Sequence, residues 1–171
     1  MARVGFVTDH VDRILAQWHR ERPDLDVSPM AVIGRLSRAS AAVHTRLDRT
    51  FAAHDLDRGS FDVLATLLRN GPPHRLTPAA LAADAMITSA AVAQRLNRLE
   101  ARGLIARAPN PDDGRGSLVT LTPAGKAAVE ATLPAHLATE QDLLADLTPD
   151  ERAALAALLA RVLHRAGVDP A

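Results

Sequence analysis

A mainly helical fold with one β-hairpin is predicted by three features of the sequence. Apolar residues recur at three- and four-residue intervals over most of the 171 residues, which is the spacing of amphipathic helices. Prolines and glycines separate these periodic segments. Two short stretches, 104–108 and 117–121, flank a turn rich in Pro, Asp and Gly, as two antiparallel strands do. The length fits one domain or one domain with extensions, and the hydrophobic content of 47% is that of a globular chain.

The N-terminal part is expected to form two helices. Residues 9–20 carry apolar side chains at helical spacing, and a proline-containing break follows over 21–29. A longer helix is then expected to reach His54. The first helix with its connection spans 1–28, and the region of the longer helix spans 29–59.

The middle of the chain, 60–122, has the element order of a winged helix-turn-helix. Ser60 is expected to cap a first helix, and Thr77, followed by proline, is expected to cap a short second one. A third helix over 89–103 ends at a glycine, which is typical of a helix C-terminus. The hairpin comes next and would form a two-stranded β-wing.

Two further helices are expected after the hairpin. Thr122 and a following proline begin the first, which Pro134 is expected to interrupt and kink. A capping box at 148–151 begins the second. The predicted fold class is therefore mainly α: a winged helix-turn-helix with a two-stranded β-wing and further helices at both termini, those of the C-terminal part lying in 123–171. The last helix carries an apolar stripe that needs a partner: Leu155, Leu158, Leu159, Val162 and Leu163.

Composition and charge exclude several classes of protein. Twenty basic and twenty acidic residues cancel, which excludes a uniformly cationic nucleic-acid binder. Residues 88–118 nevertheless hold five arginines against three acids, so a local contact with DNA is possible. With no cysteine, no disulfide or thiolate site can form. The seven histidines lack the spacing of metal ligands and no nucleophilic triad is evident, so we expect no catalytic residue, metal or cofactor.

No segment has the length or apolar content of a membrane span, and the N-terminus lacks the apolar core of a signal peptide. We therefore expect a cytoplasmic protein without a membrane partner.

The helix over 89–103 carries the candidate DNA-reading face. On a helical wheel Val92, Leu96 and Leu99 fall together and are expected to face the core. The opposite face carries amide and guanidinium groups, which can pair with adenine and guanine in the major groove. A solvated polar face is the alternative. Thr88 and Ser89, at the helix N-terminus, suit a phosphate. The candidate contacts on the outward face are Ala90, Gln94, Asn97 and Arg98.

The hairpin tip adds Asp113 and Arg115 to the candidate DNA contacts. An arginine there suits the narrow minor groove of A·T-rich DNA, and the aspartate two residues earlier could hold the guanidinium extended. A surface turn with a weak ion pair is the alternative.

Four residues are candidates for a ligand site or switch. Arg95 lies at the edge of the apolar face, where a half-buried guanidinium needs an acceptor. Arg107 lies at the base of the first wing strand, and Asp62 lies in the first turn of its helix. Trp18 is the one tryptophan. Each also has a purely structural explanation: an ion pair under the wing, a first-turn acid, or an aromatic anchor for the N-terminal helix.

The run ITSAAVAQRLNRLEARGLIARAPNPDDGRGSLVTLTPAG, residues 87–125, strongly resembles the MarR family of winged-helix transcription regulators. The resemblance rests on the Ser/Thr-rich helix start, the R-L-x-x-L-E-x-x-G-L-I ending, the D-x-R wing tip and the L-T-x-x-G entry to the next helix. It implies an obligate homodimer, built by interleaving the helices near both termini, that binds a palindromic operator in double-stranded DNA. The resemblance makes 1–28 an extra N-terminal helix with its connection, 29–59 a dimerisation and linking helix, and 123–171 the C-terminal part of the helical dimerisation region.

The extra N-terminal helix is similar to that of the urate-responsive branch of this family (the HucR, PecS and TamR regulators). Trp18, Asp62, Arg95 and Arg107 occupy the positions that carry the ligand site in that branch. The resemblance implies a small anionic effector, urate or a polycarboxylate such as trans-aconitate, held by Trp18 and Arg95. We expect Asp62 to pair with Arg107 until a bound anion repels it and moves the recognition helix.

The sequence therefore predicts a ligand-responsive regulator, most simply a repressor, rather than an enzyme. A winged-helix dimerisation or interaction module that does not bind DNA is the alternative.

Overall fold

The computed structural model describes residues 8–86, 89–111 and 113–168. The chain divides into two compact units, 1–46 and 47–171, which are described in turn.

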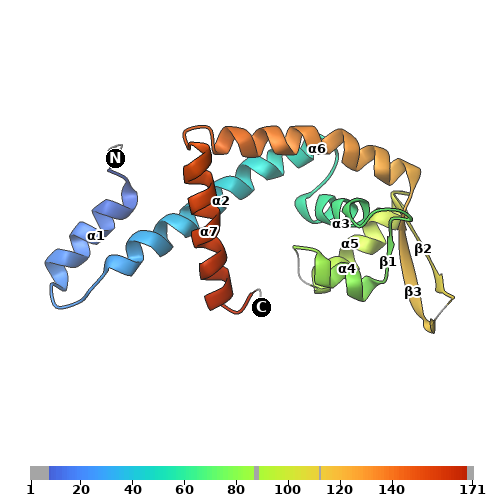
Figure 1. Cartoon of the computed structure of the whole chain (residues 1–171), viewed down its shortest axis with the longest axis horizontal. Helices are drawn as coiled ribbons and strands as arrows, with labels where there is room; N and C mark the ends of the chain where they lie inside the picture. The colour runs from blue at the N-terminus through green and yellow to red at the C-terminus, as the bar shows by residue number, and fades with distance from the viewer. Residues whose placement is uncertain (1–7, 87–88, 112, 169–171) are drawn as a thin grey trace. The chain divides into compact units, whose positions relative to one another are not determined.

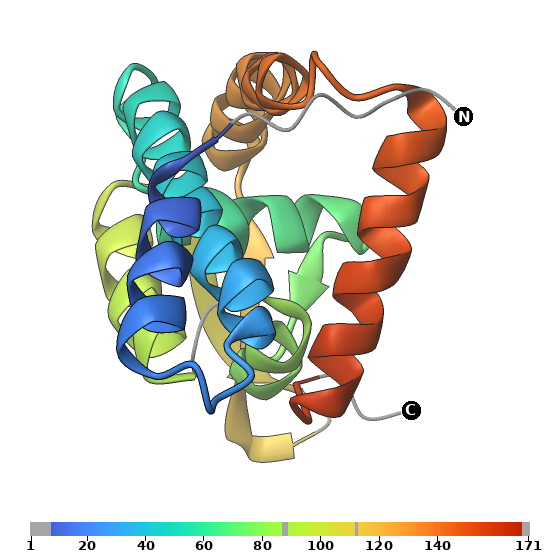
Figure 2. The same ribbon diagram turned by 90° about the vertical axis from the view of Figure 1, so that its left-hand side faces the viewer.

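The first unit pairs an extra helix with the beginning of a long one. Helix α1 (His10–Glu21) lies beside the N-terminal part of α2 (Ser28–Ala52), as Figure 2 shows. Val11, 3% exposed, packs opposite Gly34 of α2. The two helices expected in this region are confirmed, and their bounds differ from the expected ones by only one or two residues.

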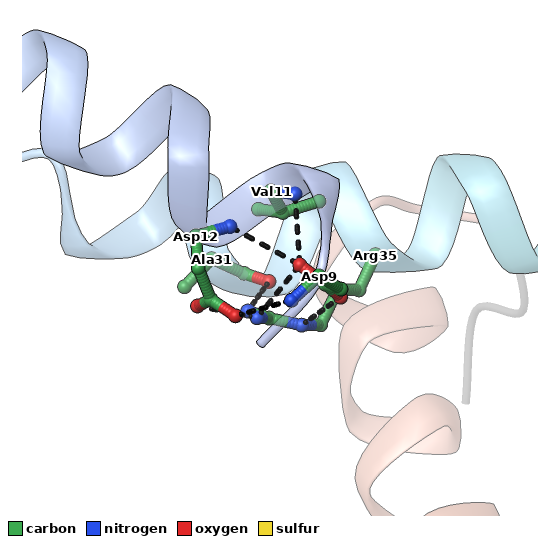
Figure 3. A network of polar contacts seen from close by, with 5 residues as sticks. All are labelled: Asp9, Val11, Asp12, Ala31 and Arg35. Atoms are coloured by element: carbon green, nitrogen blue, oxygen red, sulfur yellow. Dashed lines mark hydrogen bonds and ion pairs between the residues drawn. The ribbon is translucent and has the colours of Figure 1, made fainter. Parts of the chain in front are cut away.

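An ion-pair network joins the start of α1 to α2 (Figure 3). The Asp9 side chain caps α1 by accepting the amides of Val11 (2.8 Å) and Asp12 (3.1 Å). Arg35 donates to both carboxylate oxygens of Asp9 and, at 2.6 Å, to Asp12. Its remaining Nη1 donates to the Ala31 carbonyl. The amide of Asp9 and the Arg35 guanidinium hold the pKa of Asp12 below its usual value. Charged hydrogen bonds therefore join the start of α1 to α2, beside the buried Val11.

The second unit contains the expected helix-turn-helix and wing, so the winged helix-turn-helix is confirmed (Figure 1). Its three strands form an antiparallel sheet of order β1-β3-β2. The predicted hairpin is β2 and β3, with Ile105 opposite Leu121. The third strand, β1, was not predicted and pairs Arg75 with Thr120. The elements are α3 (Arg58–Arg69), β1 (Arg75–Leu76), α4 (Pro78–Asp84), α5 (Ser89–Ala101), β2 (Ile105–Asn110) and β3 (Asp113–Leu121).

The core of this unit lies around α3, which packs against α4, α5 and α6 (Pro123–Leu143). Phe51, from the end of α2, stacks on Phe61 at 4.7 Å and on His136 of α6 at 5.4 Å between ring centroids. Other fully buried side chains are Val63, Leu64, Leu67, Leu81, Val92, Leu99, Ile105, Val119 and Val129.

Most helices begin at the expected capping residues, with one exception. Thr77, Thr122 and Thr148 each accept an amide of the first turn, as expected. The cap of α3 is Asp57, not Ser60, so the helix begins three residues earlier than a cap at Ser60 predicts. Pro134 does not interrupt α6, which continues as one 21-residue helix, because a proline removes only one backbone hydrogen bond of the many that hold it.

Helix α7 (Pro149–Arg165) begins at the predicted capping box and contains no buried residue. Its apolar stripe is exposed, with Leu155, Leu158, Val162 and Leu163 each between 39% and 56% accessible. A contiguous apolar stripe of this kind is typical of an interface.

Candidate nucleic-acid interface

Helix α5 has the two faces that the wheel predicts. Val92 and Leu96 are each 2% exposed and Leu99 is fully buried, which orients the helix. Gln94, Asn97 and Arg98 are exposed. The helix therefore presents two amides and a guanidinium to solvent from a backbone fixed by core packing.

The turn between α4 and α5 is held from α3. Asp62 accepts the amide of Met86 at 2.7 Å, and Arg69 donates to the backbone carbonyl of Asp84. Burial raises the pKa of the Asp62 carboxyl, although the Met86 amide and Arg69 oppose that shift. The predicted phosphate contact Thr88 lies outside the described residues. Ser89 and the following alanine, Ala90, begin α5, but their side chains are not among those described.

Asp57 joins the start of α3 to α5. Its carboxylate accepts the amide of Ser60 at 2.9 Å and the Ser60 hydroxyl at 3.0 Å. Its Oδ1 lies 3.0 Å from Nε of Arg95, and its Oδ2 lies 3.6 Å from Nη1 of Arg98. Desolvation would raise the pKa of Asp57, but the bonds from Ser60 and the two guanidinium charges hold it below its usual value.

This arrangement gives Arg95, whose side chain is only 23% exposed, a carboxylate of opposite charge as its partner, although the buried Nε–H does not form a hydrogen bond. Sequence analysis missed Asp57. The signal available in the sequence was D-x-x-S at 57–60, in which Asp57 and Ser60 are both residue types that can cap the N-terminus of a helix.

The wing base contains a second ion pair. Arg107, on β2, donates to Glu100 at the end of α5, with Nε 2.9 Å from Oε2. The expected pair between Asp62 and Arg107 is not formed among the described residues, because each side chain has a nearer partner. At the wing tip, Asp113 and Arg115 lie on β3, but their side chains are outside the described set, so their roles stay predictions.

Trp18 lies on α1, in the first unit, and is 40% exposed. Its role in a ligand site stays a prediction.

Within the described ranges, no group of three or more His, Cys, Asp or Glu side chains could hold a metal ion. No helix formed by those residues is long and apolar enough to cross a membrane.

Comparison with known proteins agrees with this geometry. The family model described as "MarR family" matches residues 54–116. The HTH-type transcriptional regulator PecS of Dickeya dadantii is 40% identical over 162 residues, 95% of each chain. This relative belongs to the branch that the sequence resembles.

Two solved structures are also similar. Sco3205, a MarR family regulator from Streptomyces coelicolor solved in complex with DNA, is 26% identical with a TM-score of 0.77. The match covers 86% of this chain and 95% of that one. BpsR of Bordetella bronchiseptica, whose DNA binding is regulated by 6-hydroxynicotinic acid, is 32% identical with a TM-score of 0.69 and coverage of 77% and 98%. These relatives are regulators, not enzymes. With its winged helix-turn-helix and these full-length similarities, the chain belongs to the MarR family of DNA-binding transcription regulators.

Proposed function

We propose that this chain is a ligand-responsive repressor that binds a palindromic operator as a homodimer in the cytoplasm and is released by a small organic anion. The observation that carries the DNA-binding part is the exposed amide and guanidinium face of α5, opposite its three buried core residues. Amides at Gln94 and Asn97 suit adenine, and Arg98 suits guanine.

The test of DNA binding uses the intergenic DNA upstream of the protein's own gene. We expect binding in a gel shift at low salt, and we expect Asn97→Ala to weaken operator affinity roughly 5- to 150-fold, equivalent to about 1–3 kcal/mol for one bidentate pair. Gln141→Ala, which removes an exposed amide from α6, is the control and should bind as wild type. A protein that does not bind this DNA even at low salt would instead fit the interaction-module alternative.

The homodimer is supported by the exposed apolar stripe of α7. A palindromic operator presents two half-sites related by a two-fold axis, which a symmetric dimer matches.

The proposal of an anionic effector is supported by the surroundings of Arg107. A groove of about 660 Å³ lies against α4 and α5, and its lining includes Ala82, Leu96, Asn97 and Arg107. Apolar walls with one amide and one guanidinium suit a flat organic acid. A bound carboxylate would replace Glu100 on Arg107 and so loosen the wing from α5. Regulation of BpsR by a carboxylic acid fits this chemistry. Trp18, Asp62 and Arg95 stay predicted members of the effector site.

The effector test measures release of labelled operator by urate, trans-aconitate and 6-hydroxynicotinate. 6-Hydroxynicotinamide, which has the same ring without the charge, is the control. We expect the acids to release DNA and the amide not to. Arg107→Gln should raise the half-maximal effector concentration at least about tenfold after each variant is normalised to its own operator affinity. Equal release by acid and amide would contradict an anionic effector.

A further inference from the structure

The carboxylate of Asp57 lies beside two arginines of α5, Arg95 and Arg98. It caps α3 through Ser60, and its two oxygens face two different arginines: Oδ1 faces Arg95 and Oδ2 faces Arg98. These arginines are three residues apart, so they project from the same flank of α5. One carboxylate therefore lies beside both guanidinium groups.

The path of Arg95 depends on a glycine in the first turn of α3. A Cβ built on Gly59 would lie 2.7 Å from Nε of Arg95, so any other residue would displace that side chain. The Nε group is buried and close to Asp57, yet its N–H is not aligned for a hydrogen bond. Charge attraction to Asp57 and packing over Gly59 hold Arg95, not a directional bond.

Arg98 is held at one end only. Its side chain is 54% exposed, and Nη1 lies 3.6 Å from Oδ2 of Asp57. A long side chain restrained before binding loses less conformational freedom when it meets DNA.

We propose that Asp57 is a positioning residue for sequence recognition: it holds Arg95 and Arg98 in the arrangement in which α5 recognises its operator. This inference rests on the proposed DNA reading by α5. Removing the charge of Asp57 frees both arginines and adds one unit of net positive charge. Affinity for the operator should therefore fall, while affinity for unrelated DNA should hold or rise.

Two variants remove the arrangement by different routes. Asp57→Asn removes the charge but keeps the cap, because Asn caps helices as well as Asp does. Gly59→Ala keeps the charge and displaces Arg95 by contact, and the neighbouring pocket of about 190 Å³ gives that side chain room to move. Asp55→Asn is the matched control: it makes the same charge change two residues upstream, at an exposed position whose φ of 55° Asn accepts.

The experiment uses the full chain and duplexes that the wild-type chain selects from a randomised pool. Affinity for a selected duplex is divided by affinity for a scrambled duplex of equal length at the same salt. We expect this ratio to fall about tenfold in Asp57→Asn and in Gly59→Ala and to stay at the wild-type value in Asp55→Asn. A ratio in Asp57→Asn equal to that of Asp55→Asn would overturn the proposal.

Coupling between Asp57 and Arg98 separates positioning from folding. If Asp57 acts through Arg98, the effects of Asp57→Asn and Arg98→Gln on the ratio overlap, and the double variant loses less than the product of the two. If Asp57 only stabilises the fold as a helix cap, the loss of the ratio in the double variant should equal the product of the two single losses. That result would also overturn the proposal. A wild-type chain that selects no sequence would contradict the proposed function itself, whereas selection with an unchanged ratio in the variants contradicts only the role of Asp57.

Discussion

Among the described residues, the partly buried carboxyl of Asp62 has a pKa shift that makes stability depend on pH. Its pKa is raised above the ordinary 3.8 because burial disfavours the charged form. A raised pKa in the folded state means that this group supports folding fully below about pH 3.8 and loses that contribution as pH rises through the folded-state pKa. Above that point the buried charge costs stability.

We therefore expect Asp62→Asn to melt at a higher temperature than wild type at neutral pH, since the amide oxygen can still accept the Met86 amide. The difference should shrink as pH falls toward 3.8. Thermal melts from acid to neutral pH measure it. Asp146→Asn, at an exposed position after α6, controls for net charge. A difference independent of pH would contradict this account.

At the scale of single residues, the sequence predicted which side chains of α5 face the core but not which charged side chains form ion pairs. The periodicity of α5 predicted which side chains are buried, because that follows from 3.6 residues per turn. It also predicted that Arg95 needs an acceptor. That the acceptor is Asp57, and that Arg107 pairs with Glu100 rather than with Asp62, depends on how separate elements pack, and local spacing does not contain that information.

At the scale of elements, the L-T-x-x-G motif has a direct physical reason. Thr122 caps α6 by accepting the amide of Gly125 at 3.0 Å and donates to the carbonyl of Gly103 at 2.7 Å. A Cβ on Gly125 would lie 1.9 Å from the carbonyl oxygen of Leu104. The first turn of α6 thus packs directly on the backbone between α5 and β2, and this contact sets the direction in which α6 leaves the wing.

Gly125→Ala should destabilise the chain by about 1–3 kcal/mol, because backbone atoms on both sides must move to admit a methyl group. Gly34→Ala in α2 is the opposite case. Its Cβ would meet Val11 at an ordinary 3.4 Å, so the better helix propensity of alanine should stabilise by up to about 1 kcal/mol. Urea denaturation of both variants measures the contrast. Destabilisation of similar size in the two variants would show that the close approach of the Leu104 carbonyl is not what makes a side chain at position 125 unfavourable.

The sequence predicted long helices and strands better than the shortest strand. Long amphipathic helices were found from sequence to within a few residues, since many positions share one period. The two-residue strand β1 was missed because Arg75 and Leu76 are too few to show a period, and it exists only because β3 offers a free edge.

For the whole molecule, zero net charge leaves local surfaces to decide which partners are bound. One such surface is the α7 stripe, where Leu158 is 56% exposed in a helix without a buried residue. If a second copy covers this stripe, a charge placed in it is desolvated in both subunits of the dimer.

Leu158→Asp should weaken the dimer about 10- to 30-fold, which corresponds to about 1.4–2 kcal/mol. Sedimentation velocity over a dilution series measures the shift toward monomer. Ala157→Asp adds the same charge one residue earlier, on the opposite face of α7, and should leave the dimer intact. Because one subunit meets only one half-site, operator affinity should fall with dimer content in Leu158→Asp and recover when protein concentration is raised. Loss of operator binding without loss of dimer would instead mean that α7 acts on DNA binding by another route.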